Sequence, residues 1–259
     1  MRRRSLRILP VVAIALAVVA AGQAFAERAT VVRSGNLILR INGDVSPEKL
    51  PKKKMAPVTL RASGNLGTVD GSHPPAAKTV TIDFDKQGAI NARGLATCRS
   101  GQLQSRNTAA AKAACRKAIV GSGSTTVQVS FPEQAPFRAN GPLVLFNGGV
   151  RKGVTKMFIH AYVNVPTPTA LVTVVKVKKI RKGPYGTRAI ARIPKIAGGS
   201  GSLIRFNLKV RRTFQHKGKR QSYLLARCGN GRLRAHAVMR TSDGTRIGGS
   251  ILRRCKARG

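Results

Sequence analysis

Alternation of apolar and polar residues with a period of two is the feature of this sequence that most constrains its fold. The alternation runs through residues 80–85, 127–131, 205–211 and 233–240. Successive side chains of a β-strand point to opposite faces, so each of these segments has one face for a core and one for water. The sequence therefore predicts a mainly β protein, and we expect an antiparallel β-sandwich.

Gly, Pro and Asn residues bound several further segments that are expected to be strands. Residues 157–165 are apolar on both faces, which indicates a central strand. Residues 121–124 (GSGS) lack the Gly-Lys-Ser/Thr ending of a phosphate-binding loop and are expected to be an ordinary loop. The other expected strands are residues 36–43, 57–66, 142–148, 169–179, 186–193, 221–228 and 246–253.

One segment has a helical composition instead. Residues 108–120 (TAAAKAACRKAIV) are rich in alanine and contain neither Gly nor Pro. Asn107 or Thr108 can accept a hydrogen bond from the free backbone amides at its start, and Gly121 suits the position after its end. We expect a single short α-helix over about residues 108–120.

The first 26 residues have the organisation of a secretory signal peptide. Four arginines precede the apolar run 8–21, and Ala24-Phe25-Ala26 is an A-x-A cleavage site. The run is shorter than the roughly 20 apolar residues of a spanning helix. We expect cleavage after Ala26 and a secreted chain, extracellular or associated with the cell wall. Residues 27–259 are expected to form a single β-sandwich-like domain, with two small β units, about 27–150 and 151–259, as the alternative.

The positive charge of the chain is large and unevenly distributed. There are 48 Lys and Arg residues against 8 Asp and Glu, a formal net charge of +40. From residue 151 onward there are 27 basic residues and a single acid, Asp243. Bound anions or salt offset self-repulsion of this size, so a polyanionic partner is the natural inference.

Four cysteines remain in a chain that is expected to be exported, which favours disulfides. Three pairings are conceivable, and we expect the two local ones, Cys98–Cys115 and Cys228–Cys255. None of the cysteines has the CxxC-like spacing of a zinc site, and no cofactor motif is present, so neither a metal nor a cofactor is expected.

Basic residues occupy the polar side of several expected strands. If these strands share a sheet, its outer face is a cationic surface for polyanions; ordinary soluble faces intersperse acids among the bases. The alternative is a solvated face that keeps the protein soluble. The candidate polyanion-binding residues are Lys176, Lys178, Arg205, Lys209, Arg211, Arg234 and Arg240.

Other residues of catalytic type are more simply explained as structural. Asp83 and Asp85 lie two apart on one strand, so they are expected on a solvated strand face and cannot flank a substrate bond from two sides. His160 lies in the doubly apolar strand and is expected to be a buried, hydrogen-bonded core residue. Residues 70–73 (DGSH) are expected to form a turn. No catalytic residue is predicted.

Short segments in the last third of the chain follow a recognisable order. They are Gly186-Thr187, Ile193-Pro194-Lys195-Ile196-Ala197-Gly198-Gly199, Arg220-Gln221-Ser222-Tyr223-Leu224, Ala226-Arg227-Cys228, Ser242-Asp243-Gly244-Thr245 and Arg254-Cys255. With Cys98, Cys115 and the following Ala118-x-Val120-Gly121-x-Gly123, the chain resembles, over about residues 50–259, a group of uncharacterised exported proteins of high-GC actinobacteria. The resemblance implies a secreted β-rich fold with two disulfides, and it carries no activity and no functional residues.

Three functional hypotheses result. The first is a non-enzymatic envelope-associated protein with a structural or binding role, held through its cationic surface by anionic wall polymers or lipid head groups. The second is a secreted hydrolase of envelope polysaccharide, which would use carboxylates among Asp70, Asp83, Asp85 and Glu133. The third is a cationic antimicrobial or toxin-like protein. Membrane contact would be peripheral, and no motif for specific nucleic-acid recognition is present.

Overall fold

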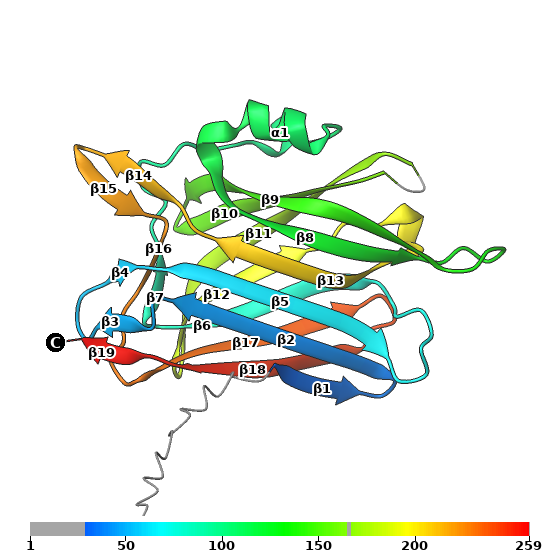
Figure 1. Ribbon diagram of the computed structural model, residues 1–259, viewed down its shortest axis with the longest axis horizontal. Coiled ribbons are helices and arrows are strands. Elements are labelled where there is room, and N and C mark those ends of the chain that lie inside the picture. The colour runs from blue at the N-terminus through cyan, green and yellow to red at the C-terminus, as the bar shows by residue number, and fades with distance from the viewer. Residues whose placement is uncertain (1–28, 165–166, 259) are drawn as a thin grey trace, which may run out of the picture.

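A computed structural model describes residues 29–164 and 167–258. The predicted signal peptide, residues 1–26, lies outside the described residues. Among the described residues, twelve strands form one continuous sheet of antiparallel neighbours (Figure 1). In order across the sheet they are β1 (Thr30–Ser34), β2 (Leu37–Ser46), β5 (Thr59–Thr68), β13 (Gly201–Val210), β8 (Ile119–Val129), β9 (Phe137–Arg151), β10 (Val154–Val163), β11 (Thr169–Lys182), β12 (Tyr185–Arg192), β6 (Ala77–Asp85), β17 (Arg232–Thr241) and β18 (Arg246–Arg254).

This sheet curls until two of its parts face each other as layers. In Figure 1, β2, β5, β13 and β8 lie in front of β12, β6 and β17. Leu39 of β2 and Ile247 of β18 belong to one core cluster, so the first and last parts of the sheet enclose a shared core. Where the two edges meet, Thr30 Oγ1 donates a hydrogen bond of 3.0 Å to the carbonyl oxygen of Ser250. The predicted antiparallel β-sandwich is confirmed, and a single sheet supplies both layers.

Strand β10 lies between β9 and β11 and is covered on both faces. Met157 and Ile159 point into the inner core. Phe158 packs on the other side, in the cluster that includes Ala111 of the helix. The predicted central strand is therefore confirmed, and the two covers explain why this segment is apolar on both faces.

The expected strands are present, and two local expectations are wrong. Residues 221–228 are split at Tyr223 into β15 (Lys219–Ser222) and β16 (Leu224–Ala226). The Tyr223 ring is 0% exposed, and its backbone amide donates to the Arg212 carbonyl at 2.8 Å. Residues 121–124 are not a loop but part of β8. Glycine is needed there because a Cβ on Gly123 would lie 1.9 Å from the Asn207 carbonyl oxygen of β13.

The single α-helix is confirmed, and it is shorter than the sequence indicates. Helix α1 (Thr108–Ala114) begins as expected, since the Asn107 side chain accepts a hydrogen bond of 2.9 Å from the Ala110 amide. The backbone leaves helical geometry at Cys115, a short 3-10 turn covers Arg116–Ala118, and β8 begins at Ile119. Cys115 is joined to Cys98, so the disulfide and the start of β8 end the helix there.

The remaining strands gather at one end of the sandwich, on the left in Figure 1. They are the three-stranded sheet β4 (Ala56–Pro57), β16 and β7 (Gly88–Ile90), the parallel pair β3 (Lys49–Pro51) and β19 (Lys256–Arg258), and the hairpin of β14 (Thr213–His216) with β15. The predicted Cys228–Cys255 disulfide is confirmed and lies at this end.

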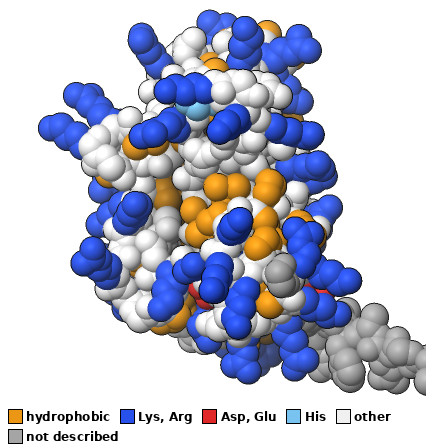
Figure 2. Space-filling model, turned by 90° about the vertical axis from the view of Figure 1, so that its left-hand side faces the viewer, with side chains coloured by type: hydrophobic (Ala, Val, Ile, Leu, Met, Phe, Trp, Pro, Cys, Tyr) orange, Lys and Arg blue, Asp and Glu red, His pale blue; other side chains and the backbone are white. Residues whose placement is uncertain are grey.

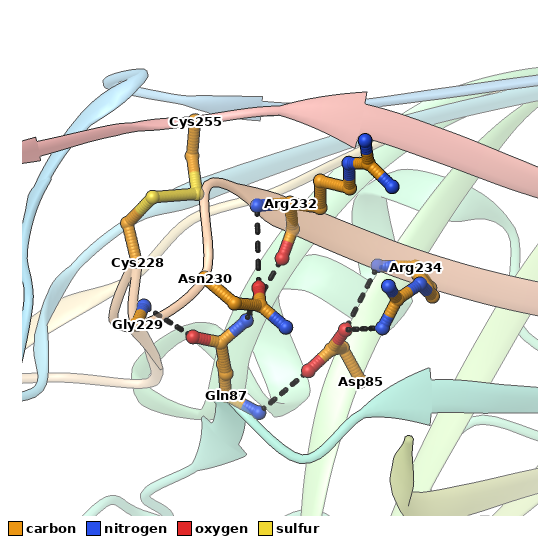
Figure 3. The surroundings of a disulfide bond; sticks show 8 residues. All are labelled: Asp85, Gln87, Cys228, Gly229, Asn230, Arg232, Arg234 and Cys255. Carbon is orange, nitrogen blue, oxygen red and sulfur yellow. Dashed lines mark hydrogen bonds and ion pairs between the residues drawn. A yellow bond between two sulfur atoms is a disulfide. The ribbon is translucent and has the colours of Figure 1, made fainter. Parts of the chain in front are cut away.

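The Gln87 side chain fastens the loop after Cys228 to the turn between β6 and β7 (Figure 3). Its Nε2 donates to Asn230 Oδ1 at 2.9 Å and to the Arg232 carbonyl at 2.8 Å. Its Oε1 accepts from the Gly229 amide. Together with the disulfide, these bonds give the end of the sandwich a defined shape.

Strands from early and late parts of the chain alternate within the large sheet. Strand β13 lies between β5 and β8, and β6 lies between β12 and β17. Residues 27–150 and 151–259 therefore contribute neighbouring strands to the same sheet. The domain boundaries themselves stay a prediction.

Candidate anion-binding faces

The structure divides the seven candidate polyanion-binding residues between two outer faces. Lys176 and Lys178 of β11 and Arg234 and Arg240 of β17 point away from the core, on the side that we call the β11–β18 face. This face is the outward side of β11, β12, β6, β17 and β18. The other three residues lie on or next to the outward side of β2, β5, β13 and β8, which we call the β2–β8 face: Arg205, Lys209 and Arg211. The seven residues therefore do not form one continuous surface.

Cross-strand pairing places four side chains of the β11–β18 face in one row. Lys178 is opposite Arg188 of β12, Arg188 is opposite Asp83 of β6, and Asp83 is opposite His236 of β17. Directly opposite residues in a sheet have Cβ atoms about 4.5–5.5 Å apart, so the side chains of the row are in contact range.

Asp83 is held by the arginine beside it in the row. Arg188 Nε donates to Asp83 Oδ1 at 2.6 Å, and Nη2 donates to Oδ2 at 2.7 Å. The Asp83 residue is only 4% exposed. These bonds from Arg188 hold the pKa of the Asp83 carboxyl below its usual value. The expected solvated strand face is therefore wrong for this residue, because the large cationic side chain covers it.

Asp85 is buried in a similar way at the end of β6 (Figure 3). Its Oδ1 accepts from the Gln87 amide at 3.0 Å, and its Oδ2 accepts from the Arg234 amide at 3.2 Å. The Arg234 guanidinium lies 4.0 Å from the same oxygen. The expected solvated face is therefore wrong for Asp85 as well, and Arg234 forms an ion pair with it.

A hollow on the β11–β18 face lies beside two exposed arginines. It is lined by Thr79 and Thr81 of β6, Val238 and Arg240 of β17, and Arg246 of β18. Arg240 is opposite both Thr79 and Arg246, so two exposed guanidinium groups and a hydroxyl lie in one row. In the sequences of the five strands of this face, β11, β12, β6, β17 and β18, Asp83 and Asp85 are the only acids. Two guanidinium forks and two hydroxyls at this spacing suit a phosphate, sulfate or carboxylate group.

Cations lie directly opposite cations at several places in the sheet. Such pairs are destabilising in the absence of an anion, and protein surfaces usually avoid them by pairing opposite charges. The pairs are Lys156–Lys176 and Arg240–Arg246. Lys178–Arg188 and Arg61–Lys209 are also opposed, but Arg188 binds Asp83 and Arg61 has Asp44 opposite it on its other side.

The β2–β8 face carries fewer charges and more amides and hydroxyls. A groove on it is lined by side chains that include Arg40 and Asn42 of β2, Ser63 and Asn65 of β5, and Arg205 and Asn207 of β13. In the cross-strand row Arg40–Asn65–Arg205–Thr126, the Asn65 amide has one guanidinium group on each side. This groove can donate hydrogen bonds to sugar hydroxyls as well as to acidic groups.

The remaining residues of catalytic type have structural partners. His160 is 0% exposed, its Nε2 lies 2.9 Å from the Arg106 carbonyl oxygen, and burial lowers the pKa of its imidazole. The expected core histidine is confirmed. Asp70 accepts from the Ser72 amide at 2.9 Å, an arrangement typical of a turn, and hydrogen bonding by Ser72 holds the pKa of its carboxyl below the usual value.

Sequence reasoning did not identify several residues of the β11–β18 face. Thr79, Thr81 and Arg246 line the hollow, and Arg188 holds Asp83. Each is a polar residue in a segment that alternates between polar and apolar residues, and this alternation indicates that its side chain faces outward. Which of them share a row depends on strand order and register, and neither can be read from one strand alone.

The fold and these faces define a disulfide-linked antiparallel β-sandwich with strongly cationic outer surfaces. No protein-family model, curated protein or solved structure shows a significant match to this chain. Among residues 29–164 and 167–258, no helix is long and apolar enough to cross a membrane. In the same residues, no three His, Cys, Asp or Glu side chains are grouped so that they could hold a metal ion.

Proposed function

We propose that this protein is a secreted, non-enzymatic component of the cell envelope that binds anionic wall polymers through its cationic outer faces. The observation that carries the proposal is the set of like-charge pairs in the sheet, above all Arg240 opposite Arg246 beside the hollow. Repulsion between such neighbours is relieved when an anionic group lies between them. A repeating polyanion can occupy several of these positions at once.

The two buried aspartates support the same proposal. Arg188 and Arg234 have acidic partners within the fold, whereas Lys176, Lys178, Arg240 and Arg246 are exposed on strands that contain no further acid. The aspartates therefore serve the structure, and the exposed cations remain for an external anion. The outer face of a sheet also lets an extended polymer cross several strands, which are spaced about 4.8 Å apart.

The test measures binding of the mature chain, residues 27–259, to a soluble polyglycerol phosphate at several salt concentrations. We expect affinity to fall steeply as salt rises, because each contacted phosphate releases counterions. Arg240→Gln with Arg246→Gln should weaken binding by about tenfold or more. Lys112→Gln with Arg116→Gln, on the exposed surface around α1, removes the same charge and should have an effect of about twofold or less.

Equal losses in the two double variants would show that net charge, and not this face, decides binding. Release of the protein from isolated cell envelopes by molar salt would support a surface attachment through charge. Retention under those conditions would contradict the proposal.

The hydrolase hypothesis gains no support from the two hollows. Neither the hollow beside Arg240 nor the groove of the β2–β8 face is lined by a carboxylate. Asp83 and Asp85 are both hydrogen-bonded within the fold. A polysaccharide hydrolase of the usual kind needs two carboxyl groups facing a shared cleft.

A further inference from the structure

The end of the sandwich that holds the Cys228–Cys255 disulfide has an apolar outer surface. The three-stranded sheet β4–β16–β7 consists entirely of apolar residues and glycine. Pairing puts Pro57, Leu225 and Ala89 in one cross-strand row. On either side of this row, Ala56, Leu224 and Ile90 pack into the core clusters, and the three residues of the row do not. Side chains alternate along strands, so the row Pro57–Leu225–Ala89 faces outward.

This row is partly open to solvent and is extended by a neighbouring methionine. Pro57 is exposed, Leu225 and Ala89 are half-buried, and Met55, two residues before Pro57, is 40% exposed. Figure 2 shows an apolar patch on this end of the molecule, with Lys and Arg side chains around it. Exposed apolar area that polar groups surround in this way usually marks a contact surface.

Exposed cations come from every segment that borders the patch. Three consecutive lysines, residues 52–54, lead into Met55, and the tip of the β14–β15 hairpin carries three more basic residues. Glu48 is the single acid in segments 48–58, 86–93, 213–228 and 256–258. The exposed basic residues of these segments are Lys49, Lys52, Lys53, Lys54, Lys86, Arg93, Lys217, Lys219, Arg220, Lys256 and Arg258.

The surface is held in place by covalent and hydrogen bonds. Cys228 is joined to Cys255, and its amide donates to the Pro51 carbonyl at 2.9 Å. The Arg227 amide donates to the Gln87 carbonyl at 3.0 Å. These bonds connect β3, β16 and the β6–β7 turn, so the apolar row and its basic rim keep a fixed arrangement before any partner binds.

The two properties of this end, an apolar centre and a basic rim, match one partner better than others. A hydrophilic polyanion offers phosphates but no hydrocarbon to cover Met55 and the row at Leu225. A bilayer of anionic phospholipids offers both in one plane: phosphates at the surface and acyl chains just beneath. Long Lys and Arg side chains can lie along apolar surface and still reach the phosphates.

We propose that this end docks on the surface of an anionic phospholipid bilayer, with Met55 and the Pro57–Leu225–Ala89 row entering the head-group region and the surrounding lysines and arginines contacting phosphates. The surface and the partner differ from those of the polymer-binding faces. The inference rests on the proposed function only in placing the protein in the envelope. Docking would leave the β11–β18 and β2–β8 faces free for polymer.

The test measures co-sedimentation of the mature chain with vesicles of phosphatidylcholine alone or with phosphatidylglycerol added. We expect binding only to the vesicles that contain phosphatidylglycerol. Lys52→Gln, Lys53→Gln and Lys54→Gln together should lower the partition constant by roughly a hundredfold, because each lysine near an anionic surface contributes about a fivefold factor. The matched control, Lys112→Gln with Arg116→Gln and Lys117→Gln, should lower it by about fivefold or less.

Met55→Asp tests the apolar centre separately, since this exposed position is not needed for the core. We expect a loss of about tenfold or more in vesicle binding, with polyglycerol phosphate binding unchanged. Conversely, Arg240→Gln with Arg246→Gln should weaken polymer binding and leave vesicle binding within about twofold. The two proposals can therefore fail independently.

Three outcomes would overturn the docking proposal. One is equal vesicle binding by the Lys52–Lys54 variant and its matched control. A second is a loss of polymer binding in the Lys52–Lys54 variant as large as its loss of vesicle binding, which would make this end a polymer site. The third is release of a trapped dye from the vesicles at saturating protein, which would show bilayer disruption in place of surface docking.

Discussion

Arg188 donates two parallel hydrogen bonds to Asp83, from Nε to Oδ1 at 2.6 Å and from Nη2 to Oδ2 at 2.7 Å. The pair lies in the middle of the β11–β18 face, between Lys178 and His236 in the same cross-strand row. Asp83 is nearly inaccessible to water, whereas the Arg188 side chain is 29% exposed. If the pair is broken, water can therefore solvate the Arg188 guanidinium, whereas the buried Asp83 carboxylate loses its counter-charge.

Arg188→Gln should destabilise the fold more than Asp83→Asn. The first change leaves a buried carboxylate without its cation, at a cost of about 2–3 kcal/mol in the free energy of unfolding at pH 7. The second leaves a partly exposed guanidinium and should cost about 1 kcal/mol. Urea unfolding measures both. Arg192→Gln, an exposed position on the same face, is the charge-matched control, and a loss there equal to that of Arg188→Gln would contradict the account.

The same pair predicts a change at acidic pH. Because the folded-state pKa of Asp83 is lowered, its stabilising contribution is complete above the unfolded-state pKa of about 3.9 and is lost as pH falls through the lower folded-state pKa. Without Arg188, the folded-state pKa should rise toward the unfolded-state value. The stability of Arg188→Gln should therefore depend less on pH below about pH 4 than that of the wild type.

His160 should make the fold less stable in mild acid. Burial lowers the pKa of its imidazole, so the unfolded chain takes up a proton near pH 6.5 while the folded chain does not. Stability is complete above about pH 6.5 and declines below it until the pH has fallen through the lower folded-state pKa. His160→Gln, which can still donate to the Arg106 carbonyl, should flatten this decline in urea unfolding between about pH 7 and 5. His216→Gln, on the β14–β15 hairpin, should retain it.

The like-charge pair Arg240–Arg246 should cost stability when no anion is bound. Arg240→Gln is expected to raise the free energy of unfolding by about 0.5 kcal/mol at low ionic strength. The gain should vanish when sulfate or polyglycerol phosphate is added, because the anion relieves the repulsion only in the wild type. Arg138→Gln, whose cross-strand partner is Gln128, is the control and should show no such gain. A gain that persists in sulfate would argue against an anion site.

The two disulfides should contribute similarly to stability and differently to membrane docking. They close loops with sequence separations of 17 and 27 residues, which corresponds to about 3–4 kcal/mol each. Replacing either pair by alanine should lower the midpoint of thermal unfolding. Only loss of Cys228–Cys255 should also weaken vesicle binding, since that bond orders the basic-rimmed end. Equal vesicle binding by the two variants would show that the bond does not order the docking surface.

Gly123→Ala should be among the most damaging small substitutions in the chain. The new Cβ would lie 1.9 Å from the backbone oxygen of Asn207, so β8 and β13 would have to separate. We expect a loss of about 2–4 kcal/mol. Gly67→Ala in β5 meets nothing within 4 Å and should be near neutral. Thermal unfolding of the two variants makes the comparison, and similar midpoints would be inconsistent with the close approach.

Local patterns in the sequence predicted the elements well because they depend on nearest neighbours. Alternation marks the two faces of β6, β8, β13 and β17, and both observed disulfides join cysteines that are close in sequence. The Asn107 cap is local too. The helix end was missed because β8 begins at Ile119, and the pairing of that strand with β9 is a long-range contact.

The sequence by itself determined that the chain is mainly β, that its surface is cationic, and which side of each alternating strand is polar. Only the tertiary structure decided how those polar sides combine. Insertion of β13 between β5 and β8, and of β6 between β12 and β17, separates Arg205 and Lys209 from Arg240 and brings Thr79 beside Arg240. The physical reason is that strand periodicity is a local property, whereas strand order and register are set by long-range packing of the core.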